Sequence, residues 1–199
     1  MTESEDRLCP VFIIESPSAD DFYDKTAERQ HIANVLHFHQ IPSEVRVALD
    51  REKFKKALDE FVSHVAKHSE CPPILHVSAH GEVDGICFTD GECISWQEFC
   101  QLLKPAARQV NGGLIICMSS CHGACAKEMQ QFARSECTIA NTIIASEQEI
   151  AWADTAIGFA TFYHQRAIGN SIDDSLNAMK IASGNETFKK VTPACCNVV

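Results

Sequence analysis

The stretch LHVSAHGEVDG, Leu75–Gly85, decides the expected fold because its character changes abruptly. An apolar run ends on His80, a glycine follows at once, and the chain then turns polar. A short apolar run bounded by turn residues is typical of a strand that is buried on both faces. The sequence therefore predicts a central strand that delivers an imidazole to its carboxyl end.

The same alternation of apolar runs and amphipathic stretches repeats along the chain. We expect strands at residues 10–15, 43–49, 73–79, 114–118 and 138–145, with a hairpin at 81–94. We expect helices at residues 20–39, after Asp50, after Ser95, and at 123–134, 152–168 and 172–183. Strands that alternate with helices at this spacing predict an α/β fold with a mostly parallel central sheet covered by helices on both faces, in three layers.

Length and composition predict a single globular domain. The chain has 199 residues, of which 45% are hydrophobic and 22% charged, as in ordinary soluble proteins. We expect a flexible N-terminus at 1–9, the folded domain at 10–185 and a C-terminal tail at 186–199.

Charge and targeting signals limit the partners. A net charge of -10 argues against nucleic acid, which would need a clustered basic face. No apolar run approaches the roughly 20 residues that span a bilayer, and the first residues, MTESEDR, are acidic, so we expect a cytoplasmic protein. The final residues, Cys196 to Val199, have the form of a prenylation signal, so a membrane is expected as a partner only if this tail is lipidated.

The eleven cysteines are scattered and odd in number. In a reducing compartment most should be small buried hydrophobic residues, such as Cys100, Cys117 and Cys137. One cluster has zinc-like spacing, formed by Cys117, Cys121, His122 and Cys125. Side chains on a strand alternate between faces, so this cluster should not converge on an ion, and we expect neither a metal nor a cofactor.

Reactive side chains follow two of the predicted strands. The third strand ends in His80 and Gly81, and the fourth in SSCHG, which contains Cys121. Ligands of such sheets bind beyond the carboxyl ends of the strands, and neighbouring ends lie about 4.8 Å apart. An imidazolium and a helix N-terminus favour the thiolate that attacks. We therefore expect His80 as general base, Cys121 as nucleophile, and the amides of Gly81 and Cys121 as an oxyanion hole, with the glycines allowing the backbone to approach a substrate carbonyl.

Two of these motifs carry a resemblance to a known family. HVSAHG, followed by LIICMSSCHG, resembles the His-Gly and Cys-x-Gly blocks of the caspase-like cysteine peptidases. The segment Trp152–Met179 is similar to the closing pattern of their CHAT branch, which also contains the separases. The resemblance covers most of the chain and implies the caspase-hemoglobinase fold, catalytic His80 and Cys121, and a peptide bond as the substrate.

The same resemblance implies where a substrate would bind. Asp24 aligns with a pocket arginine of the caspases, Glu147 follows the fifth strand, and Asp154 matches an aspartate of the CHAT pattern. These acidic residues favour cleavage after a basic residue. Asp154 is equally well explained as the cap of the helix that begins there.

The resulting hypothesis is a cysteine endopeptidase that acts through a thioester intermediate. It would act on a protein or peptide substrate under an activating regulator, and the resemblance implies roles in antiphage defence or programmed cell death. The alternative is an inactive protease fold that serves as an adaptor. A phosphatase loop is excluded, because Lys127 stands where phosphate binding needs the guanidinium group of an arginine.

Overall fold

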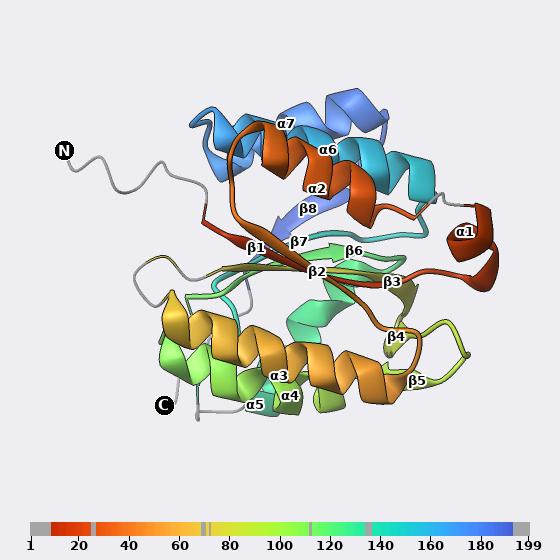
Figure 1. The fold of residues 1–199 in the computed structure, drawn as a ribbon, viewed down its shortest axis with the longest axis vertical. Coiled ribbons are helices and arrows are strands. Elements are labelled where there is room, and N and C mark those ends of the chain that lie inside the picture. The colour runs from red at the N-terminus through yellow and green to blue at the C-terminus, as the bar shows by residue number, and fades with distance from the viewer. Residues whose placement is uncertain are drawn as a thin grey trace.

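Three layers, helix, sheet and helix, make up the fold of this chain in the computed structural model (Figure 1). The structure describes residues 9–24, 27–68, 71, 73–111, 113–133 and 137–192. The α/β class with a mostly parallel central sheet covered on both faces is confirmed.

The central sheet has the strand order β2-β1-β3-β6-β7-β8. Its strands are β1 (Val11–Ser16), β2 (Ser43–Val47), β3 (Ile74–Glu82), β6 (Ile115–Ser119), β7 (Thr142–Ser146) and β8 (Phe188–Val191). Neighbours are parallel except for β8, which is antiparallel to β7. The short strands β4 (Gly85–Cys87) and β5 (Cys93–Ser95) form the expected hairpin, which pairs with the end of β3.

Two expected boundaries are wrong. The tail expected at 186–199 contains β8, which completes the sheet and whose Phe188 is fully buried, so the domain extends beyond residue 185. The helix expected at 20–39 is instead two helices, α1 (Ala19–Asp24) and α2 (Arg29–Phe38).

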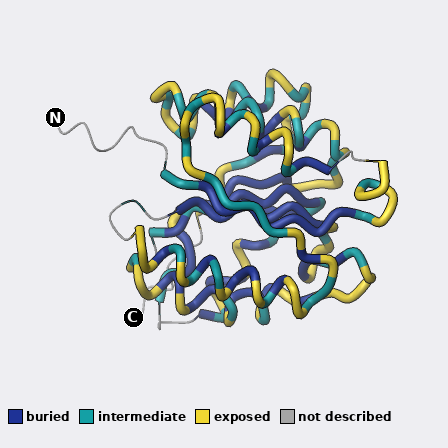
Figure 2. The backbone as a smooth tube through the Cα atoms, in the orientation of Figure 1, coloured by how far each residue is buried: buried dark blue, intermediate teal, exposed yellow. Residues whose placement is uncertain are grey.

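Two groups of helices cover the sheet on its opposite faces (Figure 1). One face carries α2, α6 (Trp152–Ala167) and α7 (Ile172–Ser183), and the other carries α3 (Arg51–Lys67), α4 (Trp96–Gln109) and α5 (Met129–Ala133). The central strands are buried between them (Figure 2). In β1, Phe12 and Ile14 enter one apolar cluster and Val11 and Ile13 the other, because successive side chains of a strand point to opposite faces.

Local capping fixes the start of α3, as the sequence predicts. The Asp50 side chain accepts a hydrogen bond from the amide nitrogen of Lys53 at 2.7 Å. One stripe of the helix is buried on the core, formed by Phe54, Ala57, Leu58, Phe61 and Val65. The cap therefore fixes where α3 begins, and the apolar stripe packs the helix against the core.

Disulfides correct part of the cysteine expectation. Cys9 pairs with Cys71, and Cys87 pairs with Cys93. Cys117 is free and buried, as expected, and Cys137 is free and half-buried. The lipidation motif at 196–199 lies outside the described residues. Across the described ranges, none of the helices has the length and apolar character needed to cross a bilayer.

Asp50→Ala should destabilise the domain by about 1 kcal/mol, because the first turn of α3 loses its side-chain acceptor. The midpoint of urea unfolding measures this loss. The control is Asp59→Ala, an exposed position within the same helix, where alanine should leave stability within about 0.5 kcal/mol of the native chain. Equal effects of the two substitutions would contradict a capping role for Asp50.

Candidate active site

Cys121 lies in the turn that follows β6. Its side chain is half-buried, and its Sγ is 3.5 Å from the amide nitrogen of Ile150, which donates a hydrogen bond to it. The carbonyl oxygen of Ile150 is 3.7 Å from the same sulfur and accepts from the thiol. The loop between β7 and α6 therefore fixes the thiol at the carboxyl edge of the sheet.

His80 occupies the matching position near the end of β3. It is exposed, and its ring meets the ring of Trp152 edge-on, with 6.1 Å between the centroids. Trp152 is the first residue of α6, so the imidazole lies between the sheet and the start of this helix.

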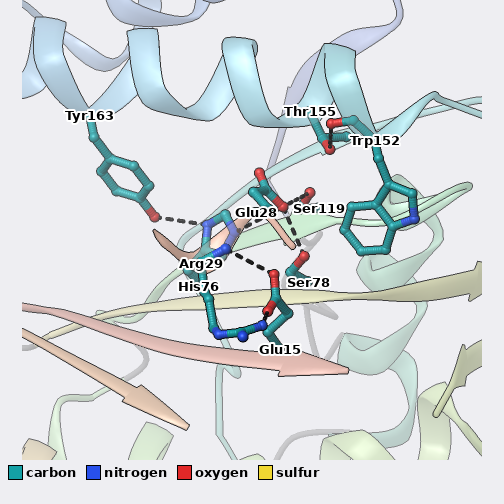
Figure 3. A network of polar contacts seen from close by, with 9 residues as sticks. All are labelled: Glu15, Glu28, Arg29, His76, Ser78, Ser119, Trp152, Thr155 and Tyr163. Atoms are coloured by element: carbon teal, nitrogen blue, oxygen red, sulfur yellow. Dashed lines mark hydrogen bonds and ion pairs between the residues drawn. The ribbon is translucent and has the colours of Figure 1, made fainter. Parts of the chain in front are cut away.

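One small cavity of about 30 Å³ brings these groups together. It is lined by Ala79, His80, Ser119, Ser120, Cys121, Ile150, Trp152 and Thr155. Figure 3 shows Trp152 and Thr155 at the start of α6, with Ser119 beneath them on the sheet side. A cavity of this size holds a water molecule or the reactive atoms of a ligand, whereas pockets that enclose a whole small ligand measure roughly 300–1,000 Å³.

The glycines beside the two residues have a steric cause. A Cβ on Gly81 would lie 1.8 Å from the backbone oxygen of Cys121, and one on Gly123 would lie 2.8 Å from Ser120 Oγ. The close neighbour of Gly81 is therefore the backbone of Cys121, and the expected approach of the glycines to a substrate carbonyl stays a prediction. The backbone amides of Gly81 and Cys121, which we expect to form the oxyanion hole, therefore lie on two pieces of backbone that contact each other.

The helix expected from residue 123 to 134 begins differently. A 3-10 helix, η1 (Gly123–Glu128), precedes α5, and its capping residue His122 has a left-handed backbone with φ of 51°. We expected the N-terminus of an α-helix to stabilise the Cys121 thiolate. The helix that follows Cys121 is instead the short 3-10 helix η1.

The three residues predicted to bind substrate do not gather at this cavity. Asp24 is exposed at the end of α1, and Glu147 is exposed after β7, with its carboxylate 4.0 Å from Lys189 Nζ. Asp154 accepts a hydrogen bond from the Asn185 side chain at 3.2 Å. None of the three is among the residues that line the cavity in the described part of the chain.

A buried carboxylate that sequence reasoning missed lies beneath the cavity. Glu28, at the start of α2, is fully buried and its Oε2 accepts from Ser78 Oγ at 2.8 Å and from Ser119 Oγ at 2.5 Å (Figure 3). The Nε2 of buried His76 is 3.8 Å from the same oxygen. Glu15 is also fully buried, and its carboxylate forms an ion pair with Arg29, the residue that follows Glu28. Polar residues inside apolar strands, as in LHVSA, were the available signal for this network.

Burial also controls a second thiol. The pKa of Cys117 is raised to about 12 by burial and by the nearby Glu28 charge, although a hydrogen bond from Tyr163 opposes the shift. Burial raises the pKa of Tyr163 as well, and its hydroxyl lies 3.1 Å from His76 Nδ1. Cys117 is therefore a protonated core residue, as predicted. Among the described residues, no three His, Cys, Asp or Glu side chains form a group that could hold a metal ion.

Comparison with known proteins does not return the expected family. No protein-family model matches the chain, and no curated protein matches it. A solved structure of Bacillus subtilis pyridoxal kinase with ADP is similar at a TM-score of 0.43 and 7% identity, over 87% of this chain and 89% of that chain. Staphylococcus aureus pyridoxal kinase is similar at 0.42 and 10% identity, over 96% of each chain.

These findings correct the family and the activity expected from the sequence. The neighbours are kinases, so the assignment to the caspase-like cysteine peptidases is contradicted, and with it the cysteine endopeptidase. The inactive caspase-fold adaptor and the roles in antiphage defence and cell death lose their support with the family. At 7–10% identity and these TM-scores, the likeness does not place the chain among the kinases either.

Gly81→Ala should destabilise the domain by roughly 1–3 kcal/mol, because the new Cβ collides with backbone that cannot rotate away. Chemical denaturation measures the loss. Glu82→Ala is the matched control, since Glu82 is exposed on the same strand and should be nearly neutral. A stable Gly81→Ala protein would show that the ends of β3 and β6 are farther apart than described.

Alkaline pH should destabilise the domain through Cys117. The folded chain keeps this proton up to about pH 12, whereas the unfolded thiol has its ordinary value of 9.0, so stability is full below pH 9 and falls as the pH rises from 9 towards 12. The expected loss is about 1.4 kcal/mol per pH unit, and Cys117→Ala should remove it from the measured slope. Ile116→Val, a neighbouring core truncation without a titrating group, should lower stability but keep the slope.

Proposed function

We propose that this chain is a thiol-dependent enzyme that transfers an acyl group from a small acyl donor to an acceptor nucleophile, with Cys121 as nucleophile and His80 as proton carrier. The observation that carries the proposal is that both side chains line one cavity. The caspase-hemoglobinase arrangement is no part of it, because only the three-layer class is shown.

The chemistry follows from the positions of the two groups. Cys121 Sγ forms a bond to the carbonyl carbon of the donor, and the thiol proton passes to the His80 imidazole. The imidazolium then gives this proton to the leaving group. The acceptor attacks the thioester carbon, its proton returns through His80, and the thiol is regenerated.

The cavity walls favour a small reacting group. Ile150 and Trp152 supply apolar surface, while Ser119, Ser120 and Thr155 supply hydroxyl groups. Ser120 Oγ is buried and has no hydrogen-bond partner among the described residues, so it is available to an oxygen of the ligand. The amides of Gly81 and Cys121 stay the proposed oxyanion donors. A protein substrate and an activating regulator stay predictions, as does the absence of a nucleic-acid partner.

Alkylation by iodoacetamide, followed by peptide mapping, tests the nucleophile. Cys121 should react faster than Cys125 and Cys137, the other half-buried free cysteines in the described part of the chain. His80→Gln should slow the reaction at Cys121 by about tenfold or more, because the proton acceptor is lost. His122→Gln is the control, since His122 is adjacent in sequence but does not line the cavity.

Transfer itself is tested with an activated acetyl ester. The native chain should release one equivalent of leaving group in a burst and carry the acetyl group on Cys121, and Cys121→Ser should abolish the thioester. Equal alkylation of Cys121, Cys125 and Cys137, or no effect of His80→Gln, would contradict the proposal.

A further inference from the structure

The hairpin beside the cavity carries a disulfide in register with His80. Across the ladder of β3 and β4, His80 lies opposite Cys87, and across the ladder of β4 and β5, Cys87 lies opposite Cys93. Cys87 and Cys93 are bonded to each other. Side chains that lie opposite each other on neighbouring strands share a face of the sheet, with their Cβ atoms about 4.5–5.5 Å apart. The Cys87 end of the disulfide is therefore the cross-strand neighbour of His80.

The hairpin does not depend on this bond for its attachment. Its other face carries Ile86 and Ile94, which are buried in the main apolar cluster. The Trp96 indole nitrogen donates to the carbonyl oxygen of Val83 at 2.7 Å, and the Trp96 amide donates to that of Asp84 at 3.0 Å. Apolar packing and these hydrogen bonds would keep the hairpin docked after the disulfide is broken.

The two disulfides differ in access and in loop size. Cys93 is exposed and Cys87 half-buried, so an incoming thiolate can reach a sulfur of this pair. The Cys87–Cys93 bond joins residues only 6 positions apart, whereas Cys9–Cys71 joins residues 62 positions apart. The stabilisation that a disulfide gives by restricting the unfolded chain grows with the length of the closed loop. The hairpin disulfide is therefore the one whose loss the fold tolerates more easily.

We propose that Cys87–Cys93 is a thiol–disulfide modification site that sets the position of His80 and thereby the reactivity of Cys121; this inference rests on the proposed function. A thiolate of a dithiol reductant attacks Cys93 Sγ, and Cys87 leaves as a thiolate that takes up a proton. The second thiol of the reductant then displaces Cys93. Two electrons and two protons pass from the dithiol to the pair, and the reductant becomes a disulfide.

The consequence follows from the neighbours of the imidazole. In the oxidised hairpin, His80 lies opposite the bonded Cys87 in the ladder, and its ring meets that of Trp152 edge-on. Reduction frees the Cys87 side chain from β5, so the imidazole loses a fixed neighbour. His80 then spends less time where it can accept the proton of Cys121.

Iodoacetamide labelling of the full-length chain tests this, with and without brief dithiothreitol treatment and anaerobic removal of the reductant. Peptide mapping should show Cys87 and Cys93 alkylated after treatment while Cys9–Cys71 stays oxidised. The rate at Cys121 should fall by about tenfold, the same order as in His80→Gln. Reduction of Cys9–Cys71 before Cys87–Cys93 would overturn the inference.

Variants separate this inference from the proposed function. The double substitution Cys87→Ser, Cys93→Ser should react at the rate of the reduced chain and ignore dithiothreitol, while Cys71→Ser should keep the response. Equal Cys121 rates in both redox states, with the effect of His80→Gln intact, would overturn the redox inference alone. An unreactive Cys121 in both states would overturn the proposed function together with it.

Discussion

The carboxylate of Glu28 is the interaction on which the arrangement of the site depends. Ser78 and Ser119 lie opposite each other in the ladder of β3 and β6, and both donate to the same oxygen of Glu28. His80 lies two residues after the first serine, and Cys121 two residues after the second. A buried carboxylate costs several kcal/mol unless hydrogen bonds compensate it, so the two strand ends must stay aligned to supply them. That alignment delivers the imidazole and the thiol to one cavity.

Local sequence signals predicted most of the helices and strands. Asp50 and Ser95 cap their helices as expected, because a cap depends on residues three positions apart. The strand β8 was missed because its place is fixed by pairing with β7 and by the burial of Phe188, neither of which its short sequence reveals. Glu28 was missed for a related reason, since its partners lie 50 and 91 residues away.

The glycines of the two motifs have a steric cause within this chain. A histidine followed by glycine, and a cysteine followed by x-Gly, were interpreted as marks of one peptidase family. Gly81 is required because the Cys121 backbone packs against it, and Gly123 because Ser120 and Met118 do. Close packing of these two strand ends therefore accounts for a glycine at each position without reference to a peptidase family.

The strand β6 and the turn after it show how position decides what a cysteine can do. Cys117 is enclosed between the sheet and the aromatic residues of α6, and burial holds its thiol in the protonated form. Cys121, two residues beyond the end of the strand, is half-buried and lines the cavity with His80. The ladders that β6 forms with β3 and β7 hold Cys117 in the core and end before Cys121, whose thiol is held by the backbone of Ile150. Reactivity in this chain is therefore set by where the sheet ends.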